Sequence, residues 1–387
     1  MTEDVVVLGS GYAGAGAIKS LEQEVSNRAD ITWISDVDHH LVLHEVHRCI
    51  RDPELQRKVS IPINEIKSSD TEFIQGTVTT LDTDERTVHL DDGSTVEYDY
   101  CVVGIGSRTA FFGIDGLERH SHTLKSLRDA LSIHDDIKSA AKEASRTDPA
   151  SVVVGGAGLS GIQSAGEIAM FRDQYRAPLD IYLVEGLDSV YPPGDPEVQG
   201  KLTKMLSDRG IDIKTGEFIT EVDEDTVYIG EETELDYDVL LWTGGITGQD
   251  CTEEIDLEKD DRSHRLHASS TFQTSDDRVF AIGDTALVDQ VDGDAAPPTA
   301  QAAWQAAEVV GENVRKTMRD QPLTTWTYED KGTVISVGDA AVANNVIGSP
   351  IDTFGGVAAE TLKKAIATRW INKITSVKRA AKAWPDM

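Results

Sequence analysis

Cysteine and basic residues are scarce in this sequence. Its 387 residues include three cysteines, which are widely spaced and form no Cys-x-x-Cys pair. So few thiols exclude a zinc ribbon, an iron–sulfur cluster or a dense disulfide framework. The 36 basic residues stand against 68 acidic ones, a formal net charge of −32. That charge excludes an ordinary nucleic-acid binder and is typical of the solvated acidic surface of halophilic proteins.

Long apolar runs are lacking too. No stretch of 18 apolar residues occurs, and the acidic start at Met1–Asp4 leads at once into an apolar strand. We therefore expect no transmembrane helix, no signal peptide and a cytoplasmic protein. Hydrophobic residues make up 39% of the chain, enough for the cores of two or three domains.

A glycine-rich turn is present, and it occurs twice. In each copy an apolar strand leads into the turn and then into a helix, whose free N-terminal N–H groups can bind a pyrophosphate. Two copies predict two bound dinucleotides. The first copy contains Gly9, Gly11, Tyr12, Ala13 and Gly14, and the second contains Gly156, Gly158, Leu159 and Gly161.

An acidic residue ends the next strand after each copy. Asp36 follows the first copy and Glu185 follows the second. A carboxylate at that place can accept hydrogen bonds from a ribose 2′-OH and repels a 2′-phosphate. The residues at 186–188 supply no arginine for such a phosphate. The second site is therefore predicted to bind NADH rather than NADPH.

Both halves then continue with a meander of strands and a second glycine turn. The first ends at residues 104–107, which include Gly106, and the second ends at Gly244 and Gly245. A third buried strand runs into Gly283 and Asp284, where the chain is expected to return to its first fold. An aspartate there can hold the ribityl chain of a flavin. This strand–helix alternation predicts an α/β fold with two Rossmann-like domains.

These elements together resemble the two-dinucleotide-binding flavoproteins, and among them the type II NADH dehydrogenases, which are single-subunit NADH:quinone oxidoreductases. The resemblance covers essentially the whole chain. It rests on the two turns and on the stretches at 43–46, 104–131, 242–245, 297–303, 328–338 and 341–342. It implies a split FAD domain at 1–117 and 246–322, an inserted NADH domain at 118–245 and a C-terminal region at 323–387.

The resemblance also implies the chemistry. NADH would reduce FAD, and the reduced flavin would pass two electrons to a membrane quinone without proton pumping. The first turn, Asp36, Gly106, Gly283 and Asp284 would bind FAD. The second turn and Glu185 would bind NADH, with Gly244 and Gly245 giving the nicotinamide close passage. Ala300, Gln301 and His44 would line the quinone site.

Gln301 and Gln163 are the predicted catalytic residues. Gln301 can donate a hydrogen bond to a quinone oxygen. The family usually has a glutamate at position 163, and a glutamine there can form hydrogen bonds but cannot relay a proton by ionising. The departure leaves two alternatives open: another route for protons, or another electron acceptor.

Two rival functions remain at this point. A flavin/thiol oxidoreductase, such as a sulfide:quinone oxidoreductase or a coenzyme A disulfide reductase, would need a redox cysteine. Cys49 is its sole plausible candidate. A low-turnover FAD redox-sensing protein would explain Gln163. The four histidines between residues 39 and 47 have no tetrahedral ligand spacing, so we predict no metal site.

The C-terminal tail differs in charge from the rest of the chain. Residues 361–384 contain seven basic side chains and no acidic one. Apolar residues recur there at spacings of three and four, the pattern of one amphipathic helix. Its tryptophans, Trp370 and Trp384, suit an anionic membrane surface. The alternatives are docking on the acidic body of the protein or packing in a dimer; the resemblance itself suggests a homodimer.

Overall fold

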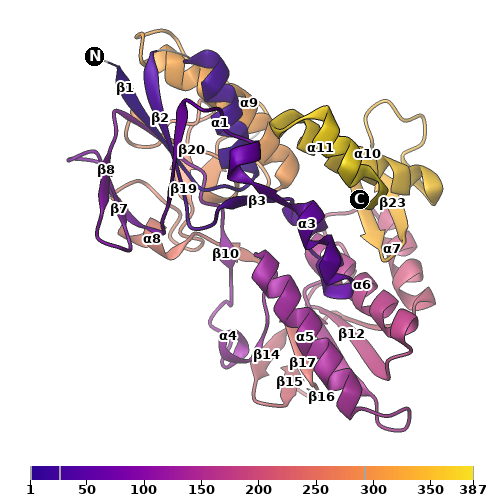
Figure 1. The fold of residues 1–387 in the computed structure, drawn as a ribbon. Helices are drawn as coiled ribbons and strands as arrows, with labels where there is room; N and C mark the ends of the chain where they lie inside the picture. The colour runs from indigo at the N-terminus through magenta and orange to yellow at the C-terminus, as the bar shows by residue number, and fades with distance from the viewer. Residues whose placement is uncertain (1, 26–27, 292, 387) are drawn as a thin grey trace.

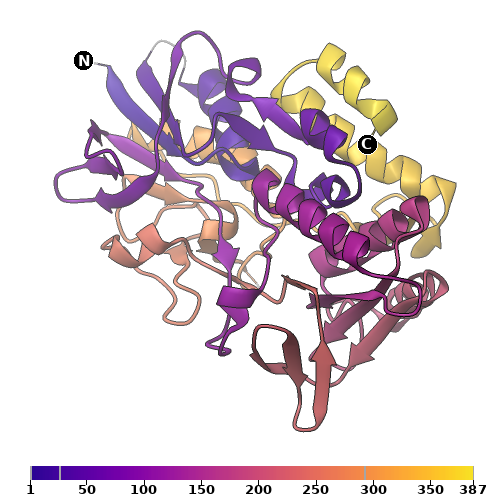
Figure 2. The ribbon, with the colours of Figure 1, turned by 60° about the horizontal axis from the view of Figure 1, so that its bottom comes forward.

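Two parallel β-sheets form the centres of two lobes, and the C-terminal helices lie against both lobes (Figures 1 and 2). The computed structural model describes residues 2–25, 28–291 and 293–386. In each lobe a glycine turn links the central strand to a helix, as in Rossmann-like folds. The predicted α/β architecture, with two such folds and a helical C-terminal region, is therefore confirmed.

The first sheet has the strand order β20-β9-β1-β2-β5, and all its pairings are parallel. The apolar residues of its central strand are almost fully buried, as expected for a parallel sheet covered on both faces. The strand of this sheet that comes last in the sequence, β20, pairs with β9, so the chain returns to this fold after completing the second one. The strands are β1 (Glu3–Leu8), β2 (Ala29–Ser35), β5 (Thr71–Gln75), β9 (Tyr100–Val103) and β20 (Val279–Ala281).

Two helices pack closely beside each other in this first lobe: α1 (Tyr12–Glu24) and α9 (Ala300–Thr317) (Figure 1). Small residues make the approach possible. A Cβ atom on Gly16 would lie 2.6 Å from the Cβ of Ala307, and one on Gly311 would lie 2.5 Å from the Ser20 hydroxyl oxygen. The start of α9 is thereby held beside the first glycine turn.

The second sheet has the order β13-β12-β11-β17 and is also parallel. Ser126 caps the helix that enters this lobe: its hydroxyl accepts from the Asp129 amide, and the Asp129 carboxylate accepts from the Ser126 amide. The strands are β11 (Ala150–Gly155), β12 (Leu179–Glu185), β13 (Ile211–Thr215) and β17 (Val239–Trp242). The helices are α5 (Leu127–Glu143), α6 (Leu159–Tyr175) and α7 (Pro196–Asp208).

Short elements connect and border the two lobes. Each lobe carries an antiparallel meander, as its sequence repeat predicts: β6 (Val78–Asp82), β7 (Thr87–Leu90) and β8 (Thr95–Glu97), and β14 (Ile219–Val222), β15 (Thr226–Ile229) and β16 (Thr233–Asp236). The two-stranded pairs are β3 (His39–Leu41) with β4 (Ser60–Pro62), β10 (Arg108–Thr109) with β18 (Ile246–Thr247), and β19 (Leu266–Ala268) with β21 (Ala286–Val288). The short helices are η1 (Leu43–Glu45), α2 (Arg48–Arg51), η2 (Pro53–Leu55), α3 (Gln56–Val59), η3 (Ile63–Glu65), α4 (Leu117–His120), α8 (Asp250–Glu254) and η4 (Gly283–Thr285).

The C-terminal region differs from the single amphipathic helix that its sequence predicts. A small sheet of β22 (Thr333–Val337), β23 (Ala340–Asn344) and β24 (Thr353–Gly355) precedes two helices, α10 (Val357–Ile374) and α11 (Val377–Ala383), and the turn η5 (Trp384–Asp386). The first helix, α10, ends with Thr375 as its C-cap. The Ser376 hydroxyl then caps α11 by accepting a hydrogen bond from the Arg379 amide.

Burial also departs from the predicted single amphipathic helix, because most of its apolar face is covered by the rest of the protein. Trp370, Ile371 and Ile374 are fully buried, because α10 lays its apolar face on the first lobe. Trp384 is 41% exposed. The apolar face of the tail is thus largely used inside the protein, although Val377 stays exposed. Within the residues that the structure describes, no helix is long and apolar enough to cross a bilayer.

Candidate functional site

The first glycine turn joins β1 to α1. Gly9 has a φ of +93°, and a Cβ atom on it would lie 2.4 Å from the Gly104 carbonyl oxygen. A Cβ atom on Gly14 would lie 1.8 Å from the Gly9 carbonyl oxygen. A Cβ atom on Gly11, the N-cap of α1, would meet nothing within 4 Å, and Gly11 provides no side-chain cap. The N-terminus of α1 therefore presents free amides to an open space, as a pyrophosphate requires.

Other predicted residues of the first lobe gather at the same end of the sheet. A Cβ atom on Gly283 would lie 2.8 Å from the Cβ of Ala13, so the turn after β20 rests on the start of α1. Asp284 accepts a hydrogen bond from the Ser107 hydroxyl at 3.3 Å. Gly106 has nothing within 4 Å of its Cβ position, and Asp36 is exposed at the end of β2.

A buried lysine also approaches Asp284, and the sequence patterns did not single it out. Lys125 donates to the Ser107 hydroxyl at 3.1 Å. Burial lowers the pKa of Lys125, while Asp284 opposes that shift. Arg265 donates to the backbone carbonyl of Asp284 at 2.8 Å. Lys125 lies in the segment that leads into the second lobe, so that segment is linked to Asp284 through the Ser107 hydroxyl.

The second glycine turn repeats the geometry of the first. Gly156 has a φ of +90°, and a Cβ atom on Gly161 would lie 1.8 Å from its carbonyl oxygen. Gly158 is the N-cap residue of α6, which begins at Leu159, and it provides no side-chain cap. A Cβ atom on Gly158 would meet nothing within 4 Å. A Cβ atom on Gly156 would lie 2.9 Å from the Cα of Gly244. The turn after β17 therefore lies directly against the second glycine turn, as expected from the sequence repeat.

Glu185 differs from Asp36 in what it binds. Its carboxylate accepts from the Ala157 amide at 2.7 Å and from the Leu187 amide at 3.0 Å. The carboxylate thus bridges the second glycine turn and its own loop. Beside it, Gly245 has a φ of +152°, and a Cβ atom there would lie 2.6 Å from the ring of Phe112. Phe112 is 68% exposed and lies at the rim of this passage.

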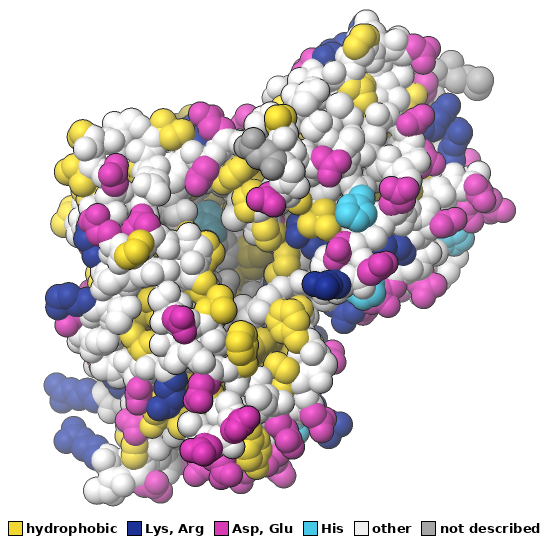
Figure 3. Space-filling view, turned by 180° about the vertical axis from the view of Figure 1, so that it is seen from behind, with side chains coloured by type: hydrophobic (Ala, Val, Ile, Leu, Met, Phe, Trp, Pro, Cys, Tyr) yellow, Lys and Arg dark blue, Asp and Glu magenta, His cyan; other side chains and the backbone are white. Residues whose placement is uncertain are grey.

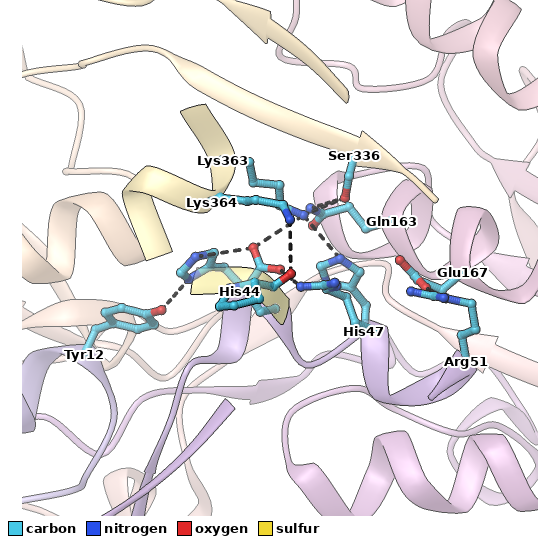
Figure 4. Close-up of polar contacts among 12 residues, drawn as sticks. Tyr12, His44, His47, Arg51, Gln163, Glu167, Ser336, Lys363 and Lys364 are labelled. Carbon is cyan, nitrogen blue, oxygen red and sulfur yellow. Dashed lines mark hydrogen bonds and ion pairs between the residues drawn. The ribbon is translucent and has the colours of Figure 1, made fainter. Parts of the chain in front are cut away.

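A buried polar cluster lies where both lobes meet the C-terminal helix (Figure 4). We call it the Glu45–Lys363 cluster. Its charged centre is the Glu45 carboxylate, with Nζ of Lys363 at 3.5 Å and the Arg48 guanidinium at 3.5 Å. The Glu45 side chain is 2% exposed and that of Lys363 is 12% exposed. The members are Tyr12, His44, Glu45, His47, Arg48, Gln163, Ser336 and Lys363.

The neighbouring charges favour the ionised form of Glu45 and oppose the effect of burial on Lys363. Burial disfavours ionisation of Glu45, but Lys363, His44 and Arg48 outweigh burial and lower the carboxyl pKa. Burial lowers the pKa of Lys363, and Glu45 is the largest influence opposing it. Lys363 also donates to the Ser336 hydroxyl at 2.5 Å and lies 3.3 Å from Nε2 of His47. Ion pairs this deeply buried need such additional hydrogen bonds.

Gln163 reaches this cluster from the first turns of α6 and is 7% exposed. Both ends of its amide are satisfied when the oxygen accepts from Nζ of Lys363 at 2.9 Å and the nitrogen donates to the Leu159 carbonyl at 3.2 Å. Glu167, one turn later on the same helix face, pairs with Arg51 at 2.7 Å. The predicted catalytic glutamine thus neighbours a lysine that the sequence patterns assigned to the surface.

Tyr12 and His44 connect the first glycine turn to the cluster. The Tyr12 hydroxyl bonds to Nδ1 of His44, whose Nε2 lies 3.6 Å from Glu45. Nearby, His40 accepts from the Trp370 indole at 2.8 Å and donates to the Ser10 carbonyl at 2.8 Å. These bonds hold α10 against the first lobe.

The start of α9 carries the predicted quinone residues Ala300 and Gln301. The Gln301 amide oxygen accepts from the Lys331 backbone at 2.7 Å, and its nitrogen donates to the Gly332 carbonyl at 3.2 Å. Gln301 therefore holds the chain just before β22, the strand that carries Ser336. The structure thus separates Gln301 from the Glu45–Lys363 cluster and links them through β22.

The membrane prediction for residues 361–384 needs correction at two of its residues. Lys363 belongs to the basic residues of this prediction, yet it is a buried partner of Glu45, and Trp370 of α10 is buried against the first lobe. The helical periodicity places Trp370 on the apolar face, but a sequence pattern cannot tell which part of the protein covers that face. The missed residues Lys363 and Ser336 lie far from the fingerprints in the sequence, and only Glu167 could be inferred, from its position one turn after Gln163.

The thiols are poorly placed for redox chemistry. Cys49 and Cys101 are fully buried, and burial raises the pKa of Cys49 to about 12. Burial also raises the pKa of Cys251, to about 11. A thiol that stays protonated is a weak nucleophile. In the part of the chain that the structure describes, no group of three His, Cys, Asp or Glu residues could hold a metal ion.

Acidic side chains spread over the face in Figure 3, where hydrophobic side chains line a hollow between two lobes.

The sequence is similar to that of known proteins along nearly its whole length. The chain is 29% identical to the type II NADH:quinone oxidoreductase of Staphylococcus aureus, over 98% of this chain and 97% of that protein.

Solved structures show the same fold. NDH2 from Plasmodium falciparum in complex with NADH aligns with a TM-score of 0.85 at 15% identity, covering 100% of this chain and 97% of that one. The sulfide:quinone oxidoreductase of Aquifex aeolicus aligns with a TM-score of 0.80 at 18% identity, covering 96% and 91%. The family model described as pyridine nucleotide-disulphide oxidoreductase matches residues 3–307. The chain therefore belongs to the pyridine nucleotide-disulphide oxidoreductase family, which confirms that it is an oxidoreductase of the predicted superfamily.

Proposed function

We propose that this protein is a FAD-dependent NADH:quinone oxidoreductase. The observation that carries the proposal is the pair of open, uncapped helix N-termini, at Gly11 and Gly158, each at the end of the central strand of its own parallel sheet. Two such sites in one chain suit two dinucleotides. The Staphylococcus aureus relatives, matched along nearly their whole length, carry this activity in their name.

The first turn binds FAD in this proposal. The amides at the start of α1 hold the pyrophosphate, Asp36 accepts from a ribose, and Asp284 accepts from the ribityl chain. The residues fit the group, because Gly11 and Gly106 leave open space where a side chain would otherwise intrude. When bound, FAD supplies the two-electron carrier between donor and acceptor. The pairing of β20 with β9 supports a split FAD domain at 1–117 and 246–322.

The second turn, in the NADH domain at 118–245, binds NADH. Glu185 exchanges its bonds to the turn for bonds to the ribose and disfavours a 2′-phosphate. Gly244 and Gly245 leave the nicotinamide a close approach to the flavin, where little side-chain chemistry is needed beyond orientation and exclusion of water.

The quinone site lies at the start of α9 and at the Glu45–Lys363 cluster. Ala300 leaves room for a ring, Gln301 positions the segment before β22, and His44 provides a polar group on the flavin side. Quinone reduction consumes protons, and the Glu45–Lys363 cluster supplies ionisable groups beside the proposed quinone site. The reaction moves electrons without pumping protons across the membrane.

Contact with an anionic membrane surface then involves the part of residues 361–384 that remains exposed. Val377 is 75% exposed and Trp384 is 41% exposed, and Lys378 and Lys382 are exposed beside them. An exposed apolar side chain next to basic ones suits a peripheral location on the cytoplasmic side of the membrane. The homodimer and the halophilic habitat stay predictions.

An anaerobic absorption experiment tests the function. NADH should bleach the flavin band of the purified holoprotein within its mixing time or shortly after, and a short-chain quinone should restore the band. NADPH at the same concentration should bleach it at least about tenfold more slowly, because Glu185 repels the 2′-phosphate. A protein that bleaches but is not restored by quinone would be a redox sensor or use another acceptor, and one without a flavin band would contradict the proposal.

A further inference from the structure

Two buried polar atoms of the Glu45–Lys363 cluster have no hydrogen-bond partner among the described residues: Nε2 of His44 and Oε1 of Glu45. They face each other at 3.6 Å, and Nζ of Lys363 lies 3.5 Å from the same Glu45 oxygen. Leaving such groups unpaired costs folding free energy. One carboxylate oxygen therefore lies between an imidazole nitrogen and an ammonium, poised to bond to either.

The orientation of His44 follows from Tyr12. Burial raises the pKa of the Tyr12 hydroxyl, so this hydroxyl stays protonated and donates to Nδ1 of His44. The remaining imidazole hydrogen is then on Nε2, which faces Glu45. In Figure 4 the labelled side chains run from Tyr12, beside the first glycine turn, to Lys363 and Gln163. The row joins the proposed flavin site to the C-terminal helix.

The charges that face Lys363 come from three directions. Glu45 and His44 lie on η1, His47, Arg48 and Arg51 lie in or beside α2, and Glu167 lies on α6 together with the neutral Gln163. Glu167 is engaged by Arg51 at 2.7 Å, and Gln163 cannot ionise. Glu45 is therefore the carboxylate that balances Lys363 against two arginines.

We propose, on the basis of the proposed function, that Glu45 is a positioning residue for quinone reduction. Its carboxylate holds Lys363 in the ammonium form, and the reduced acceptor takes a proton from that ammonium group. The acceptor gains two electrons from the flavin. Its oxygen forms an O–H bond as an N–H bond of Lys363 breaks, and the electron pair stays on the lysine nitrogen. The hydride taken from NADH accounts for the two electrons and for the second proton of the quinol. Solvent water supplies the proton that recharges Lys363.

Gln163 provides the matched test of this arrangement. Its amide oxygen lies 2.9 Å from Nζ of Lys363, so the Gln163→Glu substitution places a second carboxylate on the same ammonium. If Glu45 acts through charge, Glu45→Gln should be harmful and Gln163→Glu should compensate for it. If Glu45 acts only by filling space, the second substitution cannot help.

The test separates the two half-reactions of the holoprotein by stopped-flow absorption between pH 6 and pH 9. In Glu45→Gln, reoxidation of the flavin by a short-chain quinone should slow at least about tenfold at pH 8, and the alkaline limb of its pH profile should move to lower pH by about one unit. Reduction by NADH and reoxidation by ferricyanide, which takes no proton, should change less than about twofold.

The compensating variants complete the test. The double variant Glu45→Gln/Gln163→Glu should recover most of the quinone rate, and the single variant Gln163→Glu should move the alkaline limb to higher pH. A second readout is independent of turnover: the ¹³Cε resonance of Lys363, assigned by its loss in Lys363→Arg, should titrate at lower pH in Glu45→Gln. The single variant Gln163→Glu carries the test alone if Glu45→Gln does not fold.

An unchanged pH profile in Glu45→Gln, or equal slowing with quinone and ferricyanide, would overturn the role of Glu45. Failure of the double variant to recover would do the same. If the wild-type protein itself is not reoxidised by quinone, the proposed function fails instead, so the two failures are distinct.

Discussion

The two glycine turns have almost the same backbone but opposite surroundings. In both, a Cβ atom on the last glycine would lie 1.8 Å from the carbonyl oxygen of the first, and the helix cap is open. At the second turn, Glu185 already binds the Ala157 amide, whereas Asp36 at the first turn is exposed and makes no such bond to its turn.

This difference supports the proposal that the first site holds its dinucleotide permanently and the second exchanges it. The second site satisfies one of its own amides through Glu185, so it can stand empty between turnovers at little cost. The start of α9, the Gly283–Asp284 turn and Trp370 of α10 lie beside the first residues of α1, which suits a cofactor that stays bound. The comparison therefore supports FAD in the first lobe and NADH in the second.

The largest expected effect comes from the last glycine of each turn. Gly14→Ala should yield protein without a flavin band, because the added Cβ meets the Gly9 carbonyl. Gly161→Ala should keep the flavin band and slow its bleaching by NADH at least about 100-fold, since the clash is confined to the second turn. Absorption spectra and stopped-flow mixing measure both.

Gly200→Ala is the control for this pair, because a Cβ atom there meets nothing within 4 Å in α7. It should keep both the flavin band and the NADH rate. Loss of flavin in Gly161→Ala would contradict the independence of the two turns.

The next effect concerns the hydrogen bond from the Trp370 indole of α10 to His40 of the first lobe. Burial lowers the pKa of His40 to about 4, below about 6.5 for an unfolded chain. Its contribution to stability is therefore full above pH 6.5 and is lost as the pH falls towards 4. The loss amounts to about 3 kcal/mol of unfolding free energy. Urea unfolding at pH 7 and pH 4 should show this loss reduced in His40→Gln.

His267→Gln, at an exposed position, should leave the difference between the two pH values unchanged. If His40→Gln behaves like this control, the indole bond from Trp370 does not depend on a neutral imidazole.

A smaller effect is expected from the acidic strand ends. Glu185→Gln should raise the KM for NADH about tenfold and reduce the preference for NADH over NADPH, because the amide no longer repels a 2′-phosphate. Asp36→Asn should change flavin retention and leave the preference between NADH and NADPH as it is. Steady-state kinetics with both nucleotides, together with the flavin content, compare the two sites directly. A shift in nucleotide preference in Asp36→Asn would reverse the assignment.

The smallest effect should come from Cys49→Ser. The thiol is buried and its pKa is raised to about 12, so we expect it to take no part in electron transfer. The rate with NADH and quinone should stay within about twofold of the wild type, and stability should fall by about 1 kcal/mol because a hydroxyl replaces a buried thiol. A large loss of rate with an unchanged melting temperature would restore the flavin/thiol alternative.

Local patterns explain why much of the fold could be predicted from the sequence. The valine-rich strands, the glycine turns and the meanders are dictated by residues near each other in the chain, so their spacing locates both Rossmann-like folds. Their roles in binding FAD and NADH stay predictions that the geometry supports. The single amphipathic helix at 361–384 was wrong, because its break at Thr375 and the burial of Trp370 depend on what the helix packs against.

The sequence by itself therefore determined the two sheets, the two open helix N-termini and the acidic residue that follows each. Only the tertiary structure decided the surroundings of Gln163, since Glu45, Ser336 and Lys363 come from distant parts of the chain. The physical reason is that glycine turns act through local backbone geometry, whereas a buried ion pair exists only when packing brings opposite charges together and excludes water. Lys363 has the sequence pattern of a surface residue, and its partner Glu45 makes it part of the interior.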